Sequence, residues 1–341
     1  MWGAPMNSAD LRAFAEGRTL DALRGEANAL CESVWGKRVF VRGLIEFSNH
    51  CARNCLYCGI RGANTRVSRY RLSSDEIVEI VREGFRLGIR TFVLQGGEDP
   101  FLSVLDHCRT VERIKDATEG TAAITLSLGI RSRSEYAALK AAGADRYLLR
   151  FETSDETLHT RLRDGVPFAA RRRALDDLKE LDYEVGSGFM TGLPGETEET
   201  FYENVRLCKT LELDMVGIGP FIPHPDTPLW SDAPPSLERT LRAVALVRLL
   251  LPMANMPATT AAGSIDPLGR EKMLLSGANV LMPNLSPSEA KRHYLLYPGK
   301  VCLDEDGSSC LKCLRARVLR LGKELVFDRG DSRSAALRHV G

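Results

Sequence analysis

The sequence predicts an α/β protein whose main body is a complete (β/α)8 barrel of the TIM type. Short apolar runs alternate with amphipathic segments from about residue 38 to residue 285. The runs are apolar throughout, as expected of parallel strands that are buried on both faces. Eight strand-helix units then favour a closed barrel, and an open doubly wound sheet is the alternative.

A helical segment comes first, from Asp10 to about Trp35. Ser73 and Ser132 each precede a helix, because a glutamate three residues later can complete a capping box. A third helix has its acidic first turn at residues 196–199. The expected strands are residues 39–47, 91–97, 123–129, 146–152, 184–193, 215–222, 256–262 and 279–284.

This order divides the chain into three regions. Residues 1–37 form an N-terminal helical extension, residues 38–290 form the barrel, and residues 291–341 form a C-terminal extension with helical segments and three cysteines. The tail after about Asp328 is polar, and we expect it to be loose.

Composition excludes several classes of protein. The 341 residues are 44% hydrophobic and 27% charged, which suits a large buried core without a bias to disorder. A net charge of +1 gives no electrostatic reason to bind nucleic acid. The sequence shows neither a secretory signal nor an apolar run of membrane-spanning length. We expect a cytoplasmic protein, with neither nucleic acid nor a membrane as partner.

The nine cysteines are then expected in a reducing compartment, where metal binding, catalysis or simple burial explains them better than disulfides do. Three are isolated, and we expect these to be core residues: Cys31, Cys108 and Cys208. The other six fall into two groups of three.

The first group, Cys51, Cys55 and Cys58, has the spacing C-x3-C-x2-C just after the first strand. Three thiolates can hold three irons of a cubic iron-sulfur cluster and leave the fourth iron open to a molecule with N and O donors. A structural zinc site is the alternative, but it needs a fourth ligand. His50 is poorly placed for that role because it adjoins Cys51.

Polar residues also gather where strands end, which is where a barrel keeps its active site. They are Gln95 to Glu98, Arg150, Glu152, Thr259, Thr260 and Asn284. Arg146, Arg150 and Glu152 share one face of their strand, and buried charges need a ligand or one another. A structural Arg-Glu pair is the alternative here, and "QGGEDP" read alone is only a turn before a helix.

With Tyr57 as its aromatic residue, the C-x3-C-x-aromatic-C motif after strand one of a barrel resembles that of the radical S-adenosylmethionine (SAM) enzymes. The resemblance implies a [4Fe–4S] cluster on the three cysteines, with the open iron chelated by the amino and carboxylate groups of SAM. In that family an electron from the cluster cleaves the sulfonium to a 5′-deoxyadenosyl radical. The cofactor thus carries the hard step of the chemistry.

A closer resemblance runs from about Arg38 to Leu321, through "VLQGGEDP", "AGADRYLLRFET", "MTGLPGET", "DMVGIGPFIPHPDTPL" and "GANVLMPN". These ordered blocks resemble the HydE-type maturases of [FeFe]-hydrogenase. The implied substrate is an iron-cysteine precursor carrying CO and CN, and the implied partners are an electron donor and other hydrogenase maturation proteins. One alternative is a radical SAM enzyme for a small amino acid, like methylornithine synthase or biotin synthase. A non-enzymatic iron-sulfur or zinc-binding protein is the other.

The resemblance also implies roles for single residues. The expected SAM-binding residues are Tyr57, Gln95, Gly96, Gly97, Glu98, Thr125, Arg150, Glu152, Arg171 and Met282. The expected substrate cavity is lined by Arg146, Thr259, Thr260, Tyr294 and Tyr297. From the residues alone, a helix cap for the threonines and core packing for the tyrosines are alternatives.

Three positions leave questions open. Gly96 stands where the family has a serine, and Phe151 stands where a histidine often precedes the glutamate of strand four. Loss of a polar group at either position would alter solvent access or substrate choice. His224, in a proline-framed loop after strand six, either lines the site or fixes its loop.

The second cysteine group, Cys302, Cys310 and Cys313, follows the last strand in a segment that we expect at the surface. A subset of HydE-like proteins has this triple. The resemblance implies an auxiliary, non-catalytic [2Fe–2S] or [4Fe–4S] cluster, and three exposed thiols are the alternative.

Overall fold

The computed structural model describes residues 7–231, 236–305 and 307–334. Its strands are β1 (Arg38–Val41), β2 (Gly43–Ser48), β3 (Thr91–Gly96), β4 (Ala123–Ser127), β5 (Arg146–Leu148), β6 (Glu184–Thr191), β7 (Met215–Pro220), β8 (Val280–Leu281) and β9 (Glu324–Val326). Its helices are α1 (Ser8–Glu16), α2 (Leu20–Trp35), α3 (Ser74–Arg86), α4 (Val104–Ala117), α5 (Arg133–Ala141), α6 (Glu156–Leu162), α7 (Phe168–Glu180), α8 (Glu198–Thr210), α9 (Leu237–Leu250), α10 (Thr260–Ile265), α11 (Gly269–Leu274), α12 (Ser288–His293) and α13 (Gly307–Arg320).

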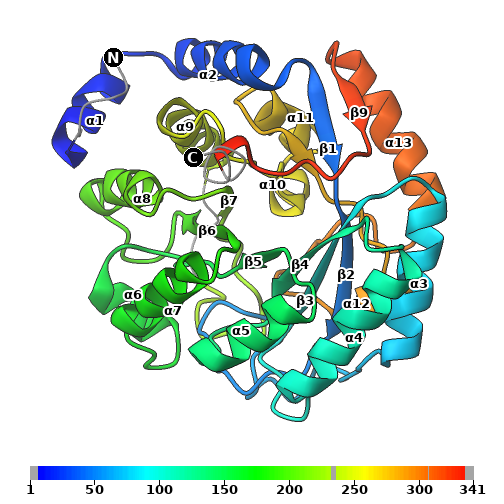
Figure 1. The fold of residues 1–341 in the computed structure, drawn as a ribbon. Helices are drawn as coiled ribbons and strands as arrows, with labels where there is room; N and C mark the ends of the chain where they lie inside the picture. Colours follow the sequence, from blue (N-terminus) through cyan, green and yellow to red (C-terminus); the bar gives the residue numbers. More distant parts are fainter. Residues whose placement is uncertain (1–6, 232–235, 306, 335–341) are drawn as a thin grey trace.

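The strands form two parallel sheets. The larger sheet has six strands in chain order, from β2 to β7, and the smaller has the order β8-β1-β9. Helices lie around the outside of the strands (Figure 1). This is the α/β architecture that the sequence predicts. None of the described helices is both long and apolar enough to span a bilayer.

Short backbone bridges link the two sheets. Asn255 pairs with Met215 at the start of β7, Pro257 pairs with Val280 of β8, and Leu44 of β2 pairs with Asn284. All of these bridges are parallel, so the pairing continues beyond both edges of the six-stranded sheet.

Several predicted elements differ in the structure. The prediction of a strand at residues 256–262 is wrong for the second half of that range, because α10 begins at Thr260. A run of alanine and threonine fits a helix as well as a strand, so periodicity did not separate them. The strand at 39–47 is divided between β1 and β2, and β9 was not predicted.

The helix starts agree better with the sequence. Ser73 with Glu76 and Ser132 with Glu135 form complete capping boxes at α3 and α5. Thr197 caps α8, whose first turn is acidic. Cys31, Cys108 and Cys208 are buried, as expected of core residues.

The segment after β9 was expected to be loose, and for residues 329–332 that expectation is wrong. Figure 1 shows this segment crossing the ring of strands from β9 toward α9. The Thr91 hydroxyl donates to the Arg329 carbonyl at 2.8 Å, and Arg329 pairs with Asp145 at 2.9 Å. Ser332 is fully buried. Residues 335–341 of the expected loose tail lie outside the described residues.

Candidate active site

The loop after β2 brings three free thiols together. Cys55 is buried, and Cys51 and Cys58 are partly buried. Burial raises the pKa of all three thiols, to about 12 for Cys58, and neighbouring cysteines raise those of Cys55 and Cys58 further. A metal binds the thiolate, so a cluster that binds here must displace the protons. In the part of the chain that the structure describes, no three His, Cys, Asp or Glu side chains are grouped as a single-ion site.

Arg69 organises this loop. Its guanidinium donates to four backbone carbonyls, those of Asn49, Ile60, Arg61 and Asn64, at 2.5 to 3.0 Å. A planar fork with five donors suits such a task better than a lysine would. The spacing of Arg69 gave no signal of this role, because a single arginine in a polar loop looks like a solvated residue.

The glycines of "QGGEDP" pack directly on the cysteine loop. A Cβ on Gly97 would lie 2.2 Å from the His50 carbonyl oxygen and 2.8 Å from Cys51 Cβ. A Cβ on Gly96 would lie 2.6 Å from the Phe47 ring. Both positions therefore require glycine for close packing. Their predicted contact with SAM stays a prediction.

Glu98 and Tyr57 meet on Arg163, a residue that the sequence reasoning missed. Arg163 donates to the Tyr57 hydroxyl at 2.9 Å and to Glu98 Oε1 at 3.4 Å. Glu98 also accepts from Arg53 at 2.9 Å. These contacts tie the cysteine loop to the end of β3 and to the residue that ends α6. Arg163 follows an amphipathic helix, and arginine is common on the exposed faces of such helices. The sequence therefore gave no signal of its contacts with Tyr57 and Glu98.

Four predicted SAM-binding residues carry buried polar atoms without a hydrogen-bond partner among the described residues. These atoms are Thr125 Oγ1, Arg150 Nε and Nη2, Glu152 Oε2, and Arg171 Nε and Nη2. Arg150 Nη2 and Glu152 Oε2 lie 3.0 Å apart as an ion pair, but not aligned for a hydrogen bond. Burial and the nearby Arg163 lower the pKa of Arg171 to about 10.

Such unpaired groups are rare in protein interiors, since each costs about 1–3 kcal/mol. A ligand with both acceptors and donors would satisfy them. SAM fits this requirement, because its carboxylate can accept from Arg150 or Arg171 and its amine or ribose can donate to Glu152. Glu152 also has φ +65, an unusual conformation for a glutamate and one that is common at functional sites.

Phe151 and His159 lie together in the interior, next to the end of β5. Phe151 is fully buried, and its ring centroid lies 5.8 Å from that of Phe189. The Phe151 carbonyl lies 2.8 Å from His159 Nδ1. Burial lowers the pKa of His159 to about 4, so its ring is neutral at pH 7. Sequence reasoning did not single out His159.

A second polar group lies where β2, β3 and the segment after α12 meet. Lys300 Nζ contacts both carboxylate oxygens of Glu46 at 2.5 and 2.6 Å, and Asn284 donates to the same carboxylate at 2.6 Å. Gln95 donates to the hydroxyl of Tyr294 at 3.3 Å, and the Tyr294 carbonyl accepts from Lys300. Tyr294 and Asn284 were expected near the site, whereas Glu46 and Lys300 were missed.

Thr259 and Tyr297 both lie at α10. Thr259 is the residue before α10, but its side chain makes no capping hydrogen bond. Its hydroxyl points toward Met273 Sδ at 3.6 Å, and a Cβ on Gly219 would lie 3.4 Å from it. Tyr297 hydrogen-bonds Ser264 of α10, and burial raises the pKa of Tyr297. Thr260 is the first residue of α10.

Met282 follows β8 and packs against a buried cluster that includes Trp35, Phe40 and Val280. Its predicted contact with SAM stays a prediction.

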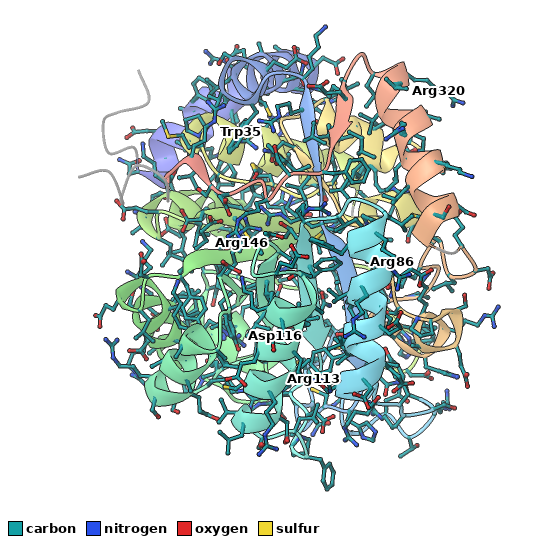
Figure 2. All side chains as sticks on the ribbon, turned by 45° about the vertical axis from the view of Figure 1, so that its right-hand side comes forward. Trp35, Arg86, Arg113, Asp116, Arg146 and Arg320 are labelled. Carbon is teal, nitrogen blue, oxygen red and sulfur yellow. The ribbon has the colours of Figure 1, made fainter. Side chains whose placement is uncertain are left out.

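Arg146 lies apart from the other residues that we expected around the substrate. The structure therefore corrects its predicted place in the substrate cavity. It is the first residue of β5, whereas Gln95 lies near the end of β3 and Glu152 follows the end of β5. Parallel strands run in one direction, so Arg146 lies at the opposite end of the sheet. Figure 2 shows it in the interior of the molecule, away from surface residues such as Arg86.

His224 both fixes its loop and faces the cysteine loop. Its Nδ1 accepts from the Asp226 backbone N–H at 3.1 Å, and its carbonyl accepts from the Thr227 hydroxyl at 2.8 Å. A Cβ on Gly59 would lie 2.6 Å from His224 Nε2. Gly59 follows Cys58, so the ring packs beside the third cysteine.

The second cysteine group is also brought together, at a peripheral position. Cys310 and Cys313 lie one turn apart on α13, and each interacts electrostatically with Cys302. Cys310 is buried, Cys302 is partly buried and Cys313 is exposed. Arg270 Nη2 lies 3.9 Å from Cys302 Sγ, and the buried Lys291 adds a second positive charge.

Comparison with known proteins agrees with this geometry. A family model described as the radical SAM superfamily matches residues 45–208. The chain is 46% identical over 310 residues to the [FeFe] hydrogenase maturase subunit HydE of Thermotoga maritima, which covers 91% of this chain and 88% of that protein. It is 30% identical to a 3-methylornithine synthase of Methanosarcina acetivorans, over 85% of this chain and 82% of that one.

Solved structures show the same fold. The structure of methylornithine synthase (PylB) superposes with a TM-score of 0.83 at 25% identity, covering 99% of this chain and 98% of that one. HydG, a maturase of the [FeFe]-hydrogenase, superposes with a TM-score of 0.80 at 18% identity, covering 95% of this chain and 73% of that one. The α/β architecture is therefore shared with both proteins.

Proposed function

Because this chain belongs to the radical SAM superfamily and within it to the HydE-type maturases, we propose that it acts on an iron-cysteine precursor carrying CO and CN. That precursor would be converted during assembly of the diiron subcluster of [FeFe]-hydrogenase. The observation that carries the proposal is the 46% identity to the HydE of Thermotoga maritima over 91% of the chain. The matched region includes both the cysteine loop and the ends of the strands.

Enzymes of this family use a [4Fe–4S] cluster and SAM. When bound, the cluster would pass one electron from an external donor to the SAM sulfonium, which would release methionine and a 5′-deoxyadenosyl radical. We assign the cluster to Cys51, Cys55 and Cys58, whose thiols lie together beside Gly97. Cys55 is buried while Cys51 and Cys58 are partly exposed, so bound SAM would complete the exclusion of water from this loop.

Arg150, Glu152, Arg171 and Thr125 are assigned to SAM. Buried atoms without a hydrogen-bond partner support this assignment, most clearly those of Arg171 and Thr125, since Arg150 and Glu152 also form an ion pair; SAM offers a matching set of donors and acceptors. Gln95 would be oriented by the Tyr294 hydroxyl. Each of these side chains binds and orients, and none needs to move a proton.

The substrate would lie deeper, beside Glu46, Lys300, Thr259 and Tyr297. β7 carries Gly217 and Gly219, whereas Gly186 and Gly188 of β6 are closely packed, since a Cβ there would lie 2.8 Å from Met215 and 2.0 Å from the Gly217 carbonyl oxygen. Glycine leaves room for a ligand, and a Cβ on Gly217 would meet nothing closer than 3.9 Å. We place the substrate next to this glycine face.

Complementation of a hydrogenase host that lacks its own maturase tests substrate identity directly. The native chain should restore hydrogenase activity, and Cys55→Ala should abolish it. Cys108→Ala serves as the matched control, because that thiol is a core residue outside the site. In parallel, reconstituted protein with dithionite and SAM should release 5′-deoxyadenosine. Failure of the native chain in complementation, with 5′-deoxyadenosine still formed, would contradict the substrate but not the radical chemistry.

A small amino acid is the second candidate substrate. The likeness to methylornithine synthase over nearly the whole of both chains favours it. A mixture of amino acids should then increase 5′-deoxyadenosine release, whereas the precursor should not. Family membership leaves no support for a non-enzymatic metal-binding protein.

We also infer that the two sheets close into one (β/α)8 barrel, with residues 38–290 as its domain. Backbone bridges support this inference, since they lead from β7 through Asn255 and Pro257 to β8, and from Asn284 to β2. β1 and β2 would then be one strand, interrupted at Arg42. The extensions would be residues 1–37 and 291–341.

We propose an auxiliary iron-sulfur cluster at Cys302, Cys310 and Cys313. The grouping of the three thiols near two positive charges supports it, since positive charge stabilises thiolates. Cys313→Ser should lower the iron content without loss of 5′-deoxyadenosine formation. Equal iron content in native and variant protein would overturn the proposal.

The partners would be an electron donor and other hydrogenase maturation proteins.

A further inference from the structure

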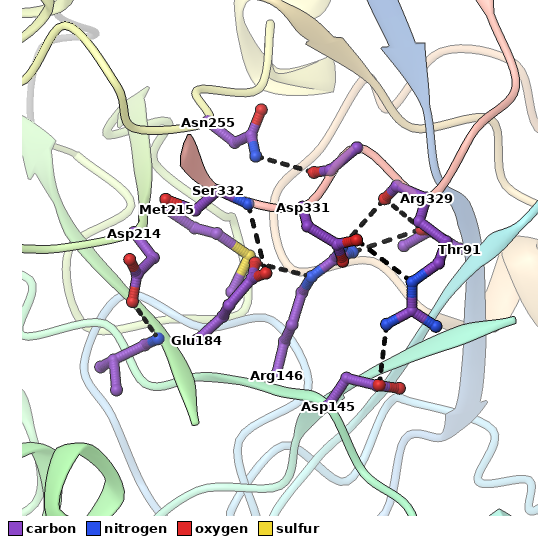
Figure 3. Close-up of polar contacts among 12 residues, drawn as sticks. Thr91, Asp145, Arg146, Glu184, Asp214, Met215, Asn255, Arg329, Asp331 and Ser332 are labelled. Carbon is purple, nitrogen blue, oxygen red and sulfur yellow. Dashed lines mark hydrogen bonds and ion pairs between the residues drawn. The ribbon is translucent and has the colours of Figure 1, made fainter. Parts of the chain in front are cut away.

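The end of the sheet opposite the cysteines is closed by a segment from the far end of the chain. Figure 3 shows residues 329–332 among side chains that begin strands β3, β5, β6 and β7. Arg146 is at the centre and is fully buried. It contacts Glu184 at 2.8 Å, Asp331 at 2.5 Å and the carbonyl of Arg329 at 2.9 Å.

The backbone of the segment is held as firmly as its side chains. The Gly330 carbonyl accepts from Asn255 Nδ2 at 2.9 Å and from Arg42 Nη2 at 3.1 Å. Gly330 has φ +56, and a Cβ there would lie 2.7 Å from the Phe40 ring. The Ser332 N–H donates to Glu184 Oε1 at 3.2 Å.

These contacts are unusual for a polar terminus. A segment of Arg, Gly, Asp and Ser has little apolar surface to bury, so its burial depends on the charges that receive it. Without the segment, the buried cations Arg42 and Arg146 would share Glu184 as their nearby carboxylate. The segment supplies them with one carboxylate and two carbonyls.

We propose that residues 329–332 form the floor of the reaction chamber and that Asp331 is a positioning residue, which holds the floor in place through Arg146. The proposal rests on the proposed radical chemistry, because an open chamber would let a reactive radical meet molecules from solution. With the floor closed, the end where the cysteine loop lies stays available for entry. Substrate then enters from that end.

Two measurements on full-length protein test the floor. Hydrogen-deuterium exchange reports opening without any cofactor chemistry: Asp331→Ala should raise amide exchange in β5, β6 and β9 on the order of tenfold, and leave α3 unchanged. In reconstituted enzyme with SAM, dithionite and perdeuterated glycerol, the same variant should transfer more deuterium to 5′-deoxyadenosine. Asp331→Asn, which keeps the shape but loses the charge, should give a smaller change in both.

Asp304→Ala is the matched control, since it removes the carboxylate of an exposed ion pair with Arg292 at another site. The proposal is overturned if Asp331→Ala and the control behave alike in exchange, or if deuterium transfer does not rise. Should Asp331→Ala not fold, both measurements are made on Asp331→Asn, and the same results overturn the proposal. If the native enzyme forms no 5′-deoxyadenosine, the proposed function fails, while the exchange result still decides whether the floor exists.

Discussion

At the scale of single residues, the molecule uses buried charge in two ways. Lys300 and Glu46 are paired, with side chains 8% and 3% exposed. Arg171 is buried but keeps two nitrogens without a partner among the described residues. A paired charge stabilises the fold only with its partner present, whereas an unpaired one indicates a ligand.

Lys300→Met should therefore destabilise the protein by about 3–5 kcal/mol, because it leaves the carboxylate of Glu46 buried and unpaired. Urea unfolding at pH 7 measures the loss. Burial already raises the pKa of Glu46, so in the variant this carboxyl favours the folded state when protonated. The lost stability should return as the pH falls toward 4.5 and below. The double variant Lys300→Met/Glu46→Gln should regain most of the lost free energy of unfolding at pH 7. A double variant that is as unstable as the single one would contradict the pairing.

Arg171→Leu should weaken SAM binding by roughly 10- to 100-fold, the value of a hydrogen bond to a charged group. The melting temperature should not fall, since the lost guanidinium has unsatisfied donors. Equilibrium dialysis with SAM measures the first effect and calorimetry the second. Arg172→Leu on the same helix is the control, because Arg172 pairs with Asp176 on the exposed face. Equal affinity in the two variants would exclude Arg171 from the SAM site.

At the scale of elements, close packing between β3 and the cysteine loop fixes the site. Gly97→Ala should destabilise the loop and reduce bound iron, because its Cβ would meet backbone at 2.2 Å, which cannot move like a side-chain tip. Iron content per chain after reconstitution measures the effect. Gly25→Ala in α2 is the control, since nothing lies within 4 Å of its Cβ, and it should stabilise α2 by about 0.5–1 kcal/mol. Full iron content in Gly97→Ala would show that the loop adjusts.

The elements also show what the sequence could predict. Capping boxes are local patterns, and Ser73 and Ser132 cap their helices as predicted. Cysteine spacing is local too, and the cluster-binding role of Cys51 stays a prediction. Thr260 begins a helix, although the sequence predicted that it continues a strand. The prediction failed because a run of small residues fits both the helical and the strand periodicity. Arg163 and Lys300 were missed because their partners, Tyr57 and Glu46, are distant in sequence, and no local pattern reports such pairs.

At the scale of the whole molecule, residues 329–332 cover the end of the six-stranded sheet at which β3, β5 and β6 begin. Residues 329–332 were expected to be loose because polar composition predicts exposure. The prediction failed since their partners Arg42 and Arg146 come from the starts of distant strands. Arg146 itself was assigned to the substrate cavity by resemblance, and contact with Asp331 gives it a structural role instead.

The contacts of residues 329–332 should make the melting temperature of the protein depend on pH in the acid range. The Asp331 side chain is 45% exposed, and Arg146 and Arg329 outweigh desolvation and hold its pKa below the usual 3.8, as Lys115 and Arg329 do for Asp145. A carboxyl whose folded pKa is depressed stabilises the fold above its unfolded pKa, and that contribution disappears as the pH falls through the folded value. Melting temperatures should thus fall between pH 5 and pH 3, and Asp331→Asn should melt lower than native protein at pH 6 but show a shallower acid slope. Parallel slopes for native and variant protein would show that the carboxylate of Asp331 does not contribute to the closure.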